Sequence, residues 1–65
     1  MPSKMREKRF FKGIPQWEVA VGTGMSQARV SLIERGYVSP TDLDKQKIAR
    51  VLKCKPEDIF PTEAK

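Results

Sequence analysis

The sequence predicts an all-α domain, and three features of the chain point to that fold class. No segment shows the alternation of apolar and polar residues that is typical of a half-buried strand. Glycine and proline divide the 65 residues into pieces of helical length. Apolar residues recur at intervals of three and four, as a buried helical stripe requires: Val19, Ala20, Val30, Ile33, Leu43, Ile48, Val51 and Leu52. We therefore expect one domain, residues 1–65, built as a compact bundle of five short helices.

The first two helices are expected in the N-terminal third of the chain. Ser3 can cap a basic first helix, and Gly13 ends it. A second helix begins at Pro15, whose fixed φ suits the first helical position. Gly22 and Gly24 close this helix only two turns later.

A third helix is expected from Ser26 to Gly36. Ser26 is a good N-cap because a hydroxyl oxygen can accept a hydrogen bond from a backbone amide of the first turn. Gly36 is a natural residue to follow a helix end. A turn at Gly24 then joins the second and third helices, and Met25 fills the corner between them. Residues 15–36 thus predict a helix-turn-helix, in which one helix lies across the DNA backbone while the other enters the major groove.

The last two helices follow a turn at residues 39–40. Thr41 and Asp44 have the spacing of a capping box at the start of the fourth helix, and Lys53 stands near its far end. Pro56 begins a final short turn that holds Ile59.

Charge and composition favour a polyanionic partner and argue against an enzyme. The net charge is +5 and the pI near 9.7, and residues 1–13 hold five basic residues against one acidic residue. Small soluble domains also carry such charge for solubility alone. There is no histidine, and Cys54, the only cysteine, is expected to be a small buried hydrophobe rather than a reactive thiol. We expect no metal, no cofactor, no signal peptide and no membrane span, and hence a soluble protein of a reducing, intracellular compartment.

A set of residues in fixed order and spacing runs through most of the chain. It comprises Gly13, Gln16, Val19, Ala20, residues 23–27, Val30, Ser31, residues 33–36, Pro40, residues 47–49, Leu52 and residues 56–60. Over residues 13–60 the sequence resembles the lambda-repressor/Cro-like helix-turn-helix family, also called the XRE family. The resemblance implies a DNA-binding domain whose recognition helix is residues 26–36.

The resemblance also implies roles for single residues. Gln16 is similar to the glutamine that opens the first helix of the motif and touches phosphate, while Gln27 and Ala28 stand where side chains read bases. A projection at about 100° per residue independently places one set of residues opposite the core, with Gln27 at its N-terminal edge. That set is Ala28, Ser31, Leu32 and Arg35.

These side chains have chemistry suited to a groove. Gln27 can pair with an adenine edge, and Ala28 or Leu32 can pack on a thymine methyl, while Ser31 is permissive. Arg35 can reach a phosphate or a guanine, and Arg29, to one side, a phosphate or solvent. We add Lys4 and Lys8 as phosphate candidates. The alternative for each is an ordinary exposed helix residue.

In the family, the glutamate at the position of Glu34 commonly pairs with an arginine, which here is Arg9. The resemblance therefore implies a structural pair between the first helix and the recognition helix. Departures from the family pattern are Pro15 in place of a capping Ser or Thr, Lys8 in place of leucine, and Lys55 in place of serine.

Three aromatic residues, Phe10, Phe11 and Trp17, also stand where the family often has polar residues. They leave two interpretations open, a locally repacked core around the first two helices and an interface with a partner chain. The leading function is a sequence-specific transcriptional regulator, a repressor or an activator, that binds double-stranded DNA as a homodimer in the cytoplasm of a prokaryote or as a phage product. The alternatives are an antitoxin-like interaction module and, least favoured, an enzyme.

Overall fold

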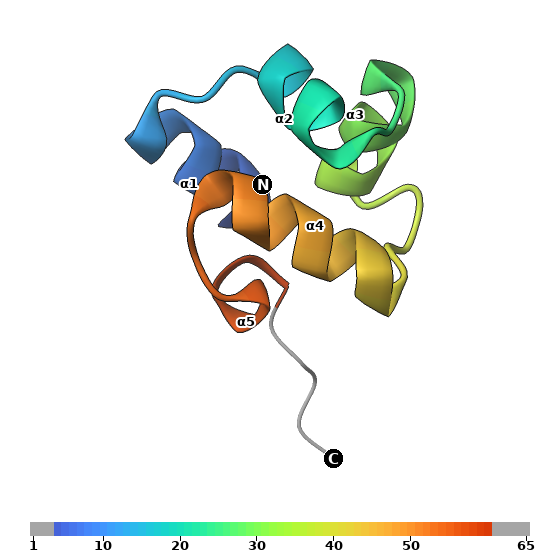
Figure 1. The fold of residues 1–65 in the computed structure, drawn as a ribbon. Helices are drawn as coiled ribbons and strands as arrows, with labels where there is room; N and C mark the ends of the chain where they lie inside the picture. The colour runs from blue at the N-terminus through green and yellow to red at the C-terminus, as the bar shows by residue number, and fades with distance from the viewer. Residues whose placement is uncertain (1–3, 61–65) are drawn as a thin grey trace.

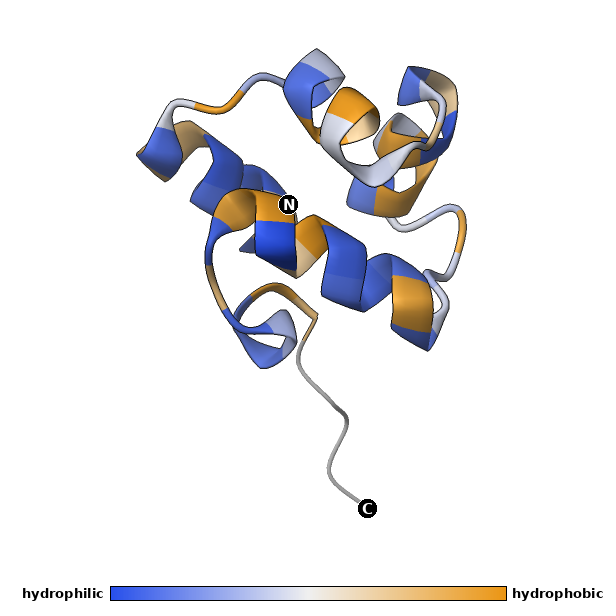
Figure 2. Cartoon of the chain, in the orientation of Figure 1, coloured by the Kyte–Doolittle hydropathy of each residue, from blue (hydrophilic) through white to orange (hydrophobic). Residues whose placement is uncertain are grey.

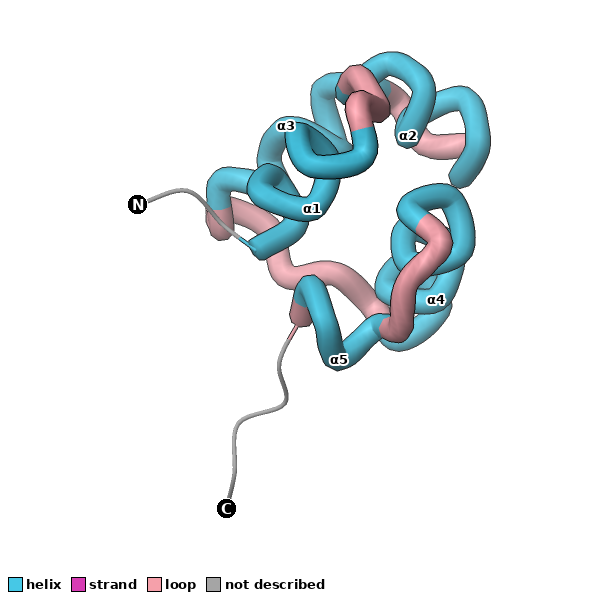
Figure 3. The backbone as a smooth tube through the Cα atoms, turned by 90° about the vertical axis from the view of Figure 1, so that its left-hand side faces the viewer, coloured by secondary structure: helices cyan, strands magenta, loops and turns pink. Residues whose placement is uncertain are grey.

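The five expected helices are present in a computed structural model, which describes residues 4–60 (Figure 1). They are α1 (Lys4–Lys12), α2 (Gln16–Thr23), α3 (Gln27–Arg35), α4 (Asp42–Leu52) and α5 (Pro56–Ile59). The described part of the chain consists of helix and loop alone, which confirms the all-α class (Figure 3). The proposed cap Ser3 lies outside the described residues.

Glycines end α1 and α2 largely as expected, with one correction. Gly13 follows α1 with a φ of 69°, and Gly24 follows α2 with a φ of 77°, both in the left-handed region that glycine tolerates. Gly22, however, lies inside α2 and does not close it. A Cβ atom at Gly22 would lie 2.7 Å from Cγ2 of Val51. Its role is therefore to let α2 approach α4 closely.

The expected caps fix the starts of α3 and α4. Ser26 Oγ accepts a hydrogen bond from the Arg29 amide at 3.1 Å. Thr41 Oγ1 accepts from the Asp44 amide at 3.0 Å, and Asp44 Oδ2 accepts from the Thr41 amide at 3.1 Å, so the capping box is confirmed. Lys53 ends α4 with a φ of 56°, the one positive φ of a residue other than glycine among residues 4–60.

The core lies where the inner faces of the helices meet, as the apolar colouring of Figure 2 indicates. Its buried residues are Met5, Val19, Ala20, Val30, Ile33, Ile48, Ala49, Leu52 and Ile59. Most of the expected stripe is confirmed, but Val51 is only half-buried and Leu43 is 58% exposed. Five residues separate Leu43 from Ile48, which turns the helix by about 500° and places the two on nearly opposite sides.

The order of packing leaves α3 at one side of the molecule. In Figure 1, α4 crosses the centre of the view, with α2 and α3 above it and α5 below. The most extensive packing is that of α2 against α3 and α4, followed by α4 against α5 and α1 against α4 and α5. Within residues 4–60, each helix is too short or too polar to cross a membrane.

Candidate nucleic-acid interface

A short, hydrogen-bonded turn joins α2 to α3. Gly24 supplies the left-handed residue, and its amide donates to the carbonyl of Ala20 at 2.9 Å. The buried hydroxyl of Thr23 donates to the carbonyl of Val19 at 2.8 Å and accepts from the Met25 amide at 3.3 Å. Because both sides of the turn are bonded, the direction in which α3 leaves α2 is fixed.

The faces of α3 agree with the projection from the sequence. Val30 and Ile33 are buried. Ser31 is half-buried, and the other side chains expected on the outer face are exposed, namely Gln27, Ala28, Leu32 and Arg35. The N-terminal turn of α3 therefore presents side chains of the size and polarity that base edges accept.

The expected pair between Arg9 and Glu34 is confirmed. Arg9 Nε donates to Glu34 Oε2 at 2.7 Å and Nη2 donates to Oε1 at 3.2 Å, while Nη1 donates to the carbonyl of Ile14 at 3.2 Å. The side chains are only 11% and 7% exposed. A two-pronged bond of this kind fixes orientation as well as distance, so it holds α1 against α3.

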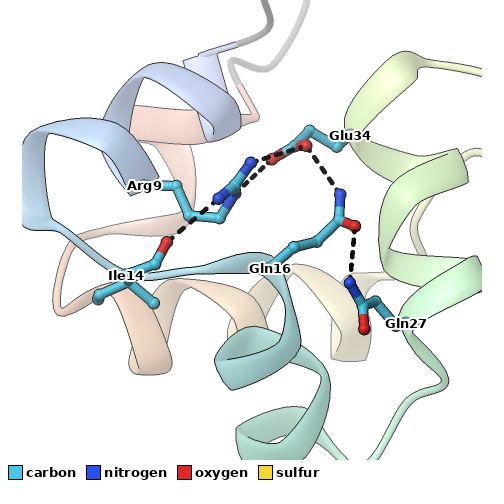
Figure 4. A network of polar contacts seen from close by, with 5 residues as sticks. All are labelled: Arg9, Ile14, Gln16, Gln27 and Glu34. Carbon is cyan, nitrogen blue, oxygen red and sulfur yellow. Dashed lines mark hydrogen bonds and ion pairs between the residues drawn. The ribbon is translucent and has the colours of Figure 1, made fainter.

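Gln16 connects the ion pair of Arg9 and Glu34 to Gln27, at the start of α3, through two hydrogen bonds (Figure 4). Gln16 Nε2 donates to Glu34 Oε1 at 3.0 Å, and Gln27 Nε2 donates to Gln16 Oε1 at 3.3 Å. A carboxylate can only accept hydrogen bonds, so Glu34 determines which end of the Gln16 amide faces it. The other end, an oxygen, is thereby turned toward Gln27.

The sequence predicts Gln16 and Gln27 only as separate DNA contacts, and the bond between them is an addition from the structure. The spacing of residues on α3 does contain one signal for it. Gln27 and Glu34 are seven residues apart, which is two helical turns, so both lie on the edge of α3 that faces Gln16.

Arg29, expected at a phosphate or in solvent, also has a partner within the chain. Its Nη2 donates to Asp44 Oδ2 at 2.6 Å, and its side chain is 40% exposed, so the phosphate contact stays a prediction. The pKa of the Asp44 carboxyl lies below its usual range, mainly because of the Thr41 amide and then because of Arg29. Asp44 had been identified only as a capping residue, and the spacing of α3 and α4 in the sequence does not reveal that its carboxylate also reaches Arg29.

Lys4 and Lys8 are not brought together with the residues of α3. They line a shallow hollow with Phe11 of α1 and Asp58 of α5. Arg9 is the residue that α1 turns toward Glu34, and Lys8, one position earlier, points about 100° away from it. Both lysines stay phosphate candidates by charge alone.

The aromatic residues do not form a repacked core. Phe10, Phe11 and Trp17 are 65%, 86% and 58% exposed. The guanidinium groups of Arg6 and Arg9 lie 5.3 Å and 5.4 Å from the centre of the Phe10 ring, within the range of a cation–π contact. The first interpretation is therefore wrong, and the interface interpretation stays open.

Cys54 is half-buried against the core, and this burial raises the pKa of its thiol. A thiol of that kind is a poor nucleophile at neutral pH. Among residues 4–60 no three acidic or cysteine side chains gather as metal ligands would.

Comparison with known proteins identifies the family. The helix-turn-helix family model, which describes lambda-repressor-like domains, matches residues 5–59. No curated protein sequence matches the chain. The crystal structure of the restriction-modification controller protein C.AhdI from Aeromonas hydrophila is similar to this fold with a TM-score of 0.80, at 29% identity over 85% of this chain and 83% of that chain. The chain therefore belongs to the lambda-repressor-like helix-turn-helix family and is a sequence-specific, DNA-binding regulator of transcription.

Proposed function

We propose that a homodimer of this chain places α3 of each copy in the major groove of a palindromic operator and represses transcription there. The observation that carries the proposal is the arrangement of bonds around α3. Gln27 and Glu34 are bonded on one edge and Arg29 on the other, while most side chains of the outer face are exposed. A helix held by its edges can enter a groove without rearrangement.

Within this proposal the outer face of α3 reads bases. Gln27 keeps its Oε1 and one N–H for an adenine edge after its bond to Gln16. Ala28 and Leu32 pack on thymine methyl groups. The hydroxyl of Ser31 can donate to or accept from a base edge, so it is compatible with more than one base. Arg35 contacts a phosphate or a guanine.

Gln16 has two tasks in this proposal. Its second N–H reaches a phosphate, and its carbonyl oxygen aligns the Gln27 amide. The solved neighbour is a controller protein of a restriction-modification system, and we propose a regulatory task of that kind, with no catalytic activity, in the cytoplasm of a prokaryote or of a phage-infected cell.

The test begins with selection of binding sites from random DNA, followed by titration of variants on the selected operator and on a scrambled duplex at one salt concentration. Gln27→Ala should weaken operator binding by about 1–3 kcal/mol and leave the scrambled duplex nearly unaffected, because no phosphate charge is lost. Gln46→Ala, an exposed glutamine of α4, is the matched control. Equal weakening on both duplexes would contradict base reading by Gln27.

A second candidate function rests on the exposed aromatic residues of α1 and α2. An antitoxin-like module binds a protein partner through exposed apolar side chains, and three aromatic residues of α1 and α2 are exposed here. Trp17 is the only tryptophan in the chain, so its fluorescence reports directly on that surface. If selection yields no operator, and Phe11→Ser abolishes co-purification of a host protein, this candidate replaces the first.

A further inference from the structure

The ion pair of Arg29 and Asp44 lies at the edge of α3 that is not bonded to α1 and α2. Arg29 follows Ala28 by one residue, which turns its side chain about 100° away from the centre of the outer face. Its guanidinium is therefore beside the proposed groove-facing surface, and with 40% of the side chain exposed it is within reach of solvent and of a neighbouring phosphate.

Asp44 is fixed in place much more firmly than Arg29. Its Oδ2 accepts from the Thr41 amide at 3.1 Å, its own amide donates to Thr41 Oγ1 at 3.0 Å, and its side chain is only 13% exposed. The same oxygen receives Arg29 Nη2 at 2.6 Å. The helix cap thus fixes the position of the Asp44 carboxylate, and the guanidinium of Arg29 reaches from α3 to α4 to bind it.

An arginine at this position has a general consequence for DNA binding. An unpaired cation beside the groove neutralises one phosphate of any sequence, which adds affinity without adding information about bases. An arginine already paired with a carboxylate must give up that contact before it can gain a phosphate. The pair as a whole carries no net charge.

We infer that Asp44 lowers the sequence-independent affinity for DNA by keeping Arg29 in a neutral ion pair beside α3. Asp44 is in this sense a positioning residue that acts through Arg29 and touches no base or phosphate. The inference rests on the proposed placement of α3 in the major groove.

The experiment measures the salt dependence of binding to a scrambled duplex. Asp44→Asn removes the charge and keeps an oxygen that can accept from the Thr41 amide. We expect a slope of log affinity against log salt that is steeper by about 0.9, and binding about three- to tenfold tighter at low salt. Asp42→Asn is the matched control, because Asp42 is an exposed carboxylate of the same helix turn with the same charge. It should leave the slope unchanged.

Arg29→Gln makes the test independent of the fold of the Asp44 variant. By itself it should leave the salt slope of the wild type unchanged, and in the Asp44→Asn background it should remove the added steepness. A slope that flattens by about 0.9 in Arg29→Gln alone would show that Arg29 already contacts a phosphate, which overturns the inference. Equal effects of Asp44→Asn and Asp42→Asn would overturn it as well.

Operator binding in the same titrations separates the inference from the function on which it rests. If the wild type prefers its operator and Gln27→Ala loses that preference, the placement of α3 stands, and unchanged slopes then refute the role of Asp44 alone. If the wild type prefers no sequence, the proposed function itself has failed.

Discussion

At the scale of single residues, the amide of Gln16 links a buried ion pair to an exposed side chain of α3. Glu34 is bonded on one side by Arg9 and on the other by Gln16, and Gln16 in turn accepts from Gln27. The chain of bonds passes from a side chain that is 7% exposed to one on the surface. Because each amide has a definite donor end and acceptor end, the buried carboxylate determines how the outermost glutamine presents its own groups.

The pair at the start of this network should contribute to stability. Arg9→Ala or Glu34→Ala each leaves a partly buried charge without its partner, and we expect each to lower the free energy of unfolding by about 1–3 kcal/mol. The double variant should cost much less than the sum. Urea unfolding of the four proteins measures the coupling, with the exposed Glu18→Ala as the control. A coupling energy of zero would mean that the two side chains do not meet in solution.

At the scale of the elements, local signals predicted helix ends well and helix faces less well. Ser26, Thr41 and Gly24 act at the positions expected of them because capping depends on neighbours a few residues away in the chain. Gly22 was expected to end α2, but the residue that requires a glycine there is Val51 of α4, which neighbouring residues in the sequence do not reveal. The partner of Arg29 was missed for the same reason, whereas the pair of Arg9 and Glu34 was found only through the family resemblance.

The close approach at Gly22 gives a prediction for α2. Gly22→Ala should destabilise the domain by about 1–3 kcal/mol, because the new methyl group would press on Val51. In a Val51→Ala background the same change should instead stabilise by about 1 kcal/mol, since alanine favours helix more than glycine does. Thermal unfolding of the single and double variants measures both effects. Gly24→Ala, strained by its positive φ, should not be rescued by Val51→Ala; rescue of both would refute the contact.

At the scale of the whole molecule, the positive charge is not spread evenly over the surface. Residues 1–13 hold much of it, yet Lys4 and Lys8 lie beside Asp58 at the side of α1 that faces α5. Arg35 stands at the C-terminal end of α3 and is exposed. Under the proposed placement of α3 on DNA, Arg35 therefore has better access to the duplex than Lys4 and Lys8, although each adds the same charge.

This asymmetry predicts different salt responses for two substitutions of equal charge. Arg35→Gln should flatten the slope of log affinity against log salt by about 0.9, because one phosphate contact is lost. Lys8→Gln should change the slope very little. Fluorescence anisotropy at several salt concentrations on one operator duplex compares them. A loss of slope with Lys8→Gln that equals the loss with Arg35→Gln would place α1 on the DNA.

The bonds that fasten α3 leave from its two edges, and the side chains of Ala28, Ser31, Leu32 and Arg35 take part in none of the hydrogen bonds or ion pairs within residues 4–60. Substitutions of exposed residues without such partners, here Ala28, Leu32 and Arg35, change stability by only about 0.5 kcal/mol. Under the proposed placement of α3, base-contacting positions such as Ala28 and Leu32 can consequently change while the domain keeps folding. A duplicated copy of this gene could then acquire a new target through a few substitutions on one helix.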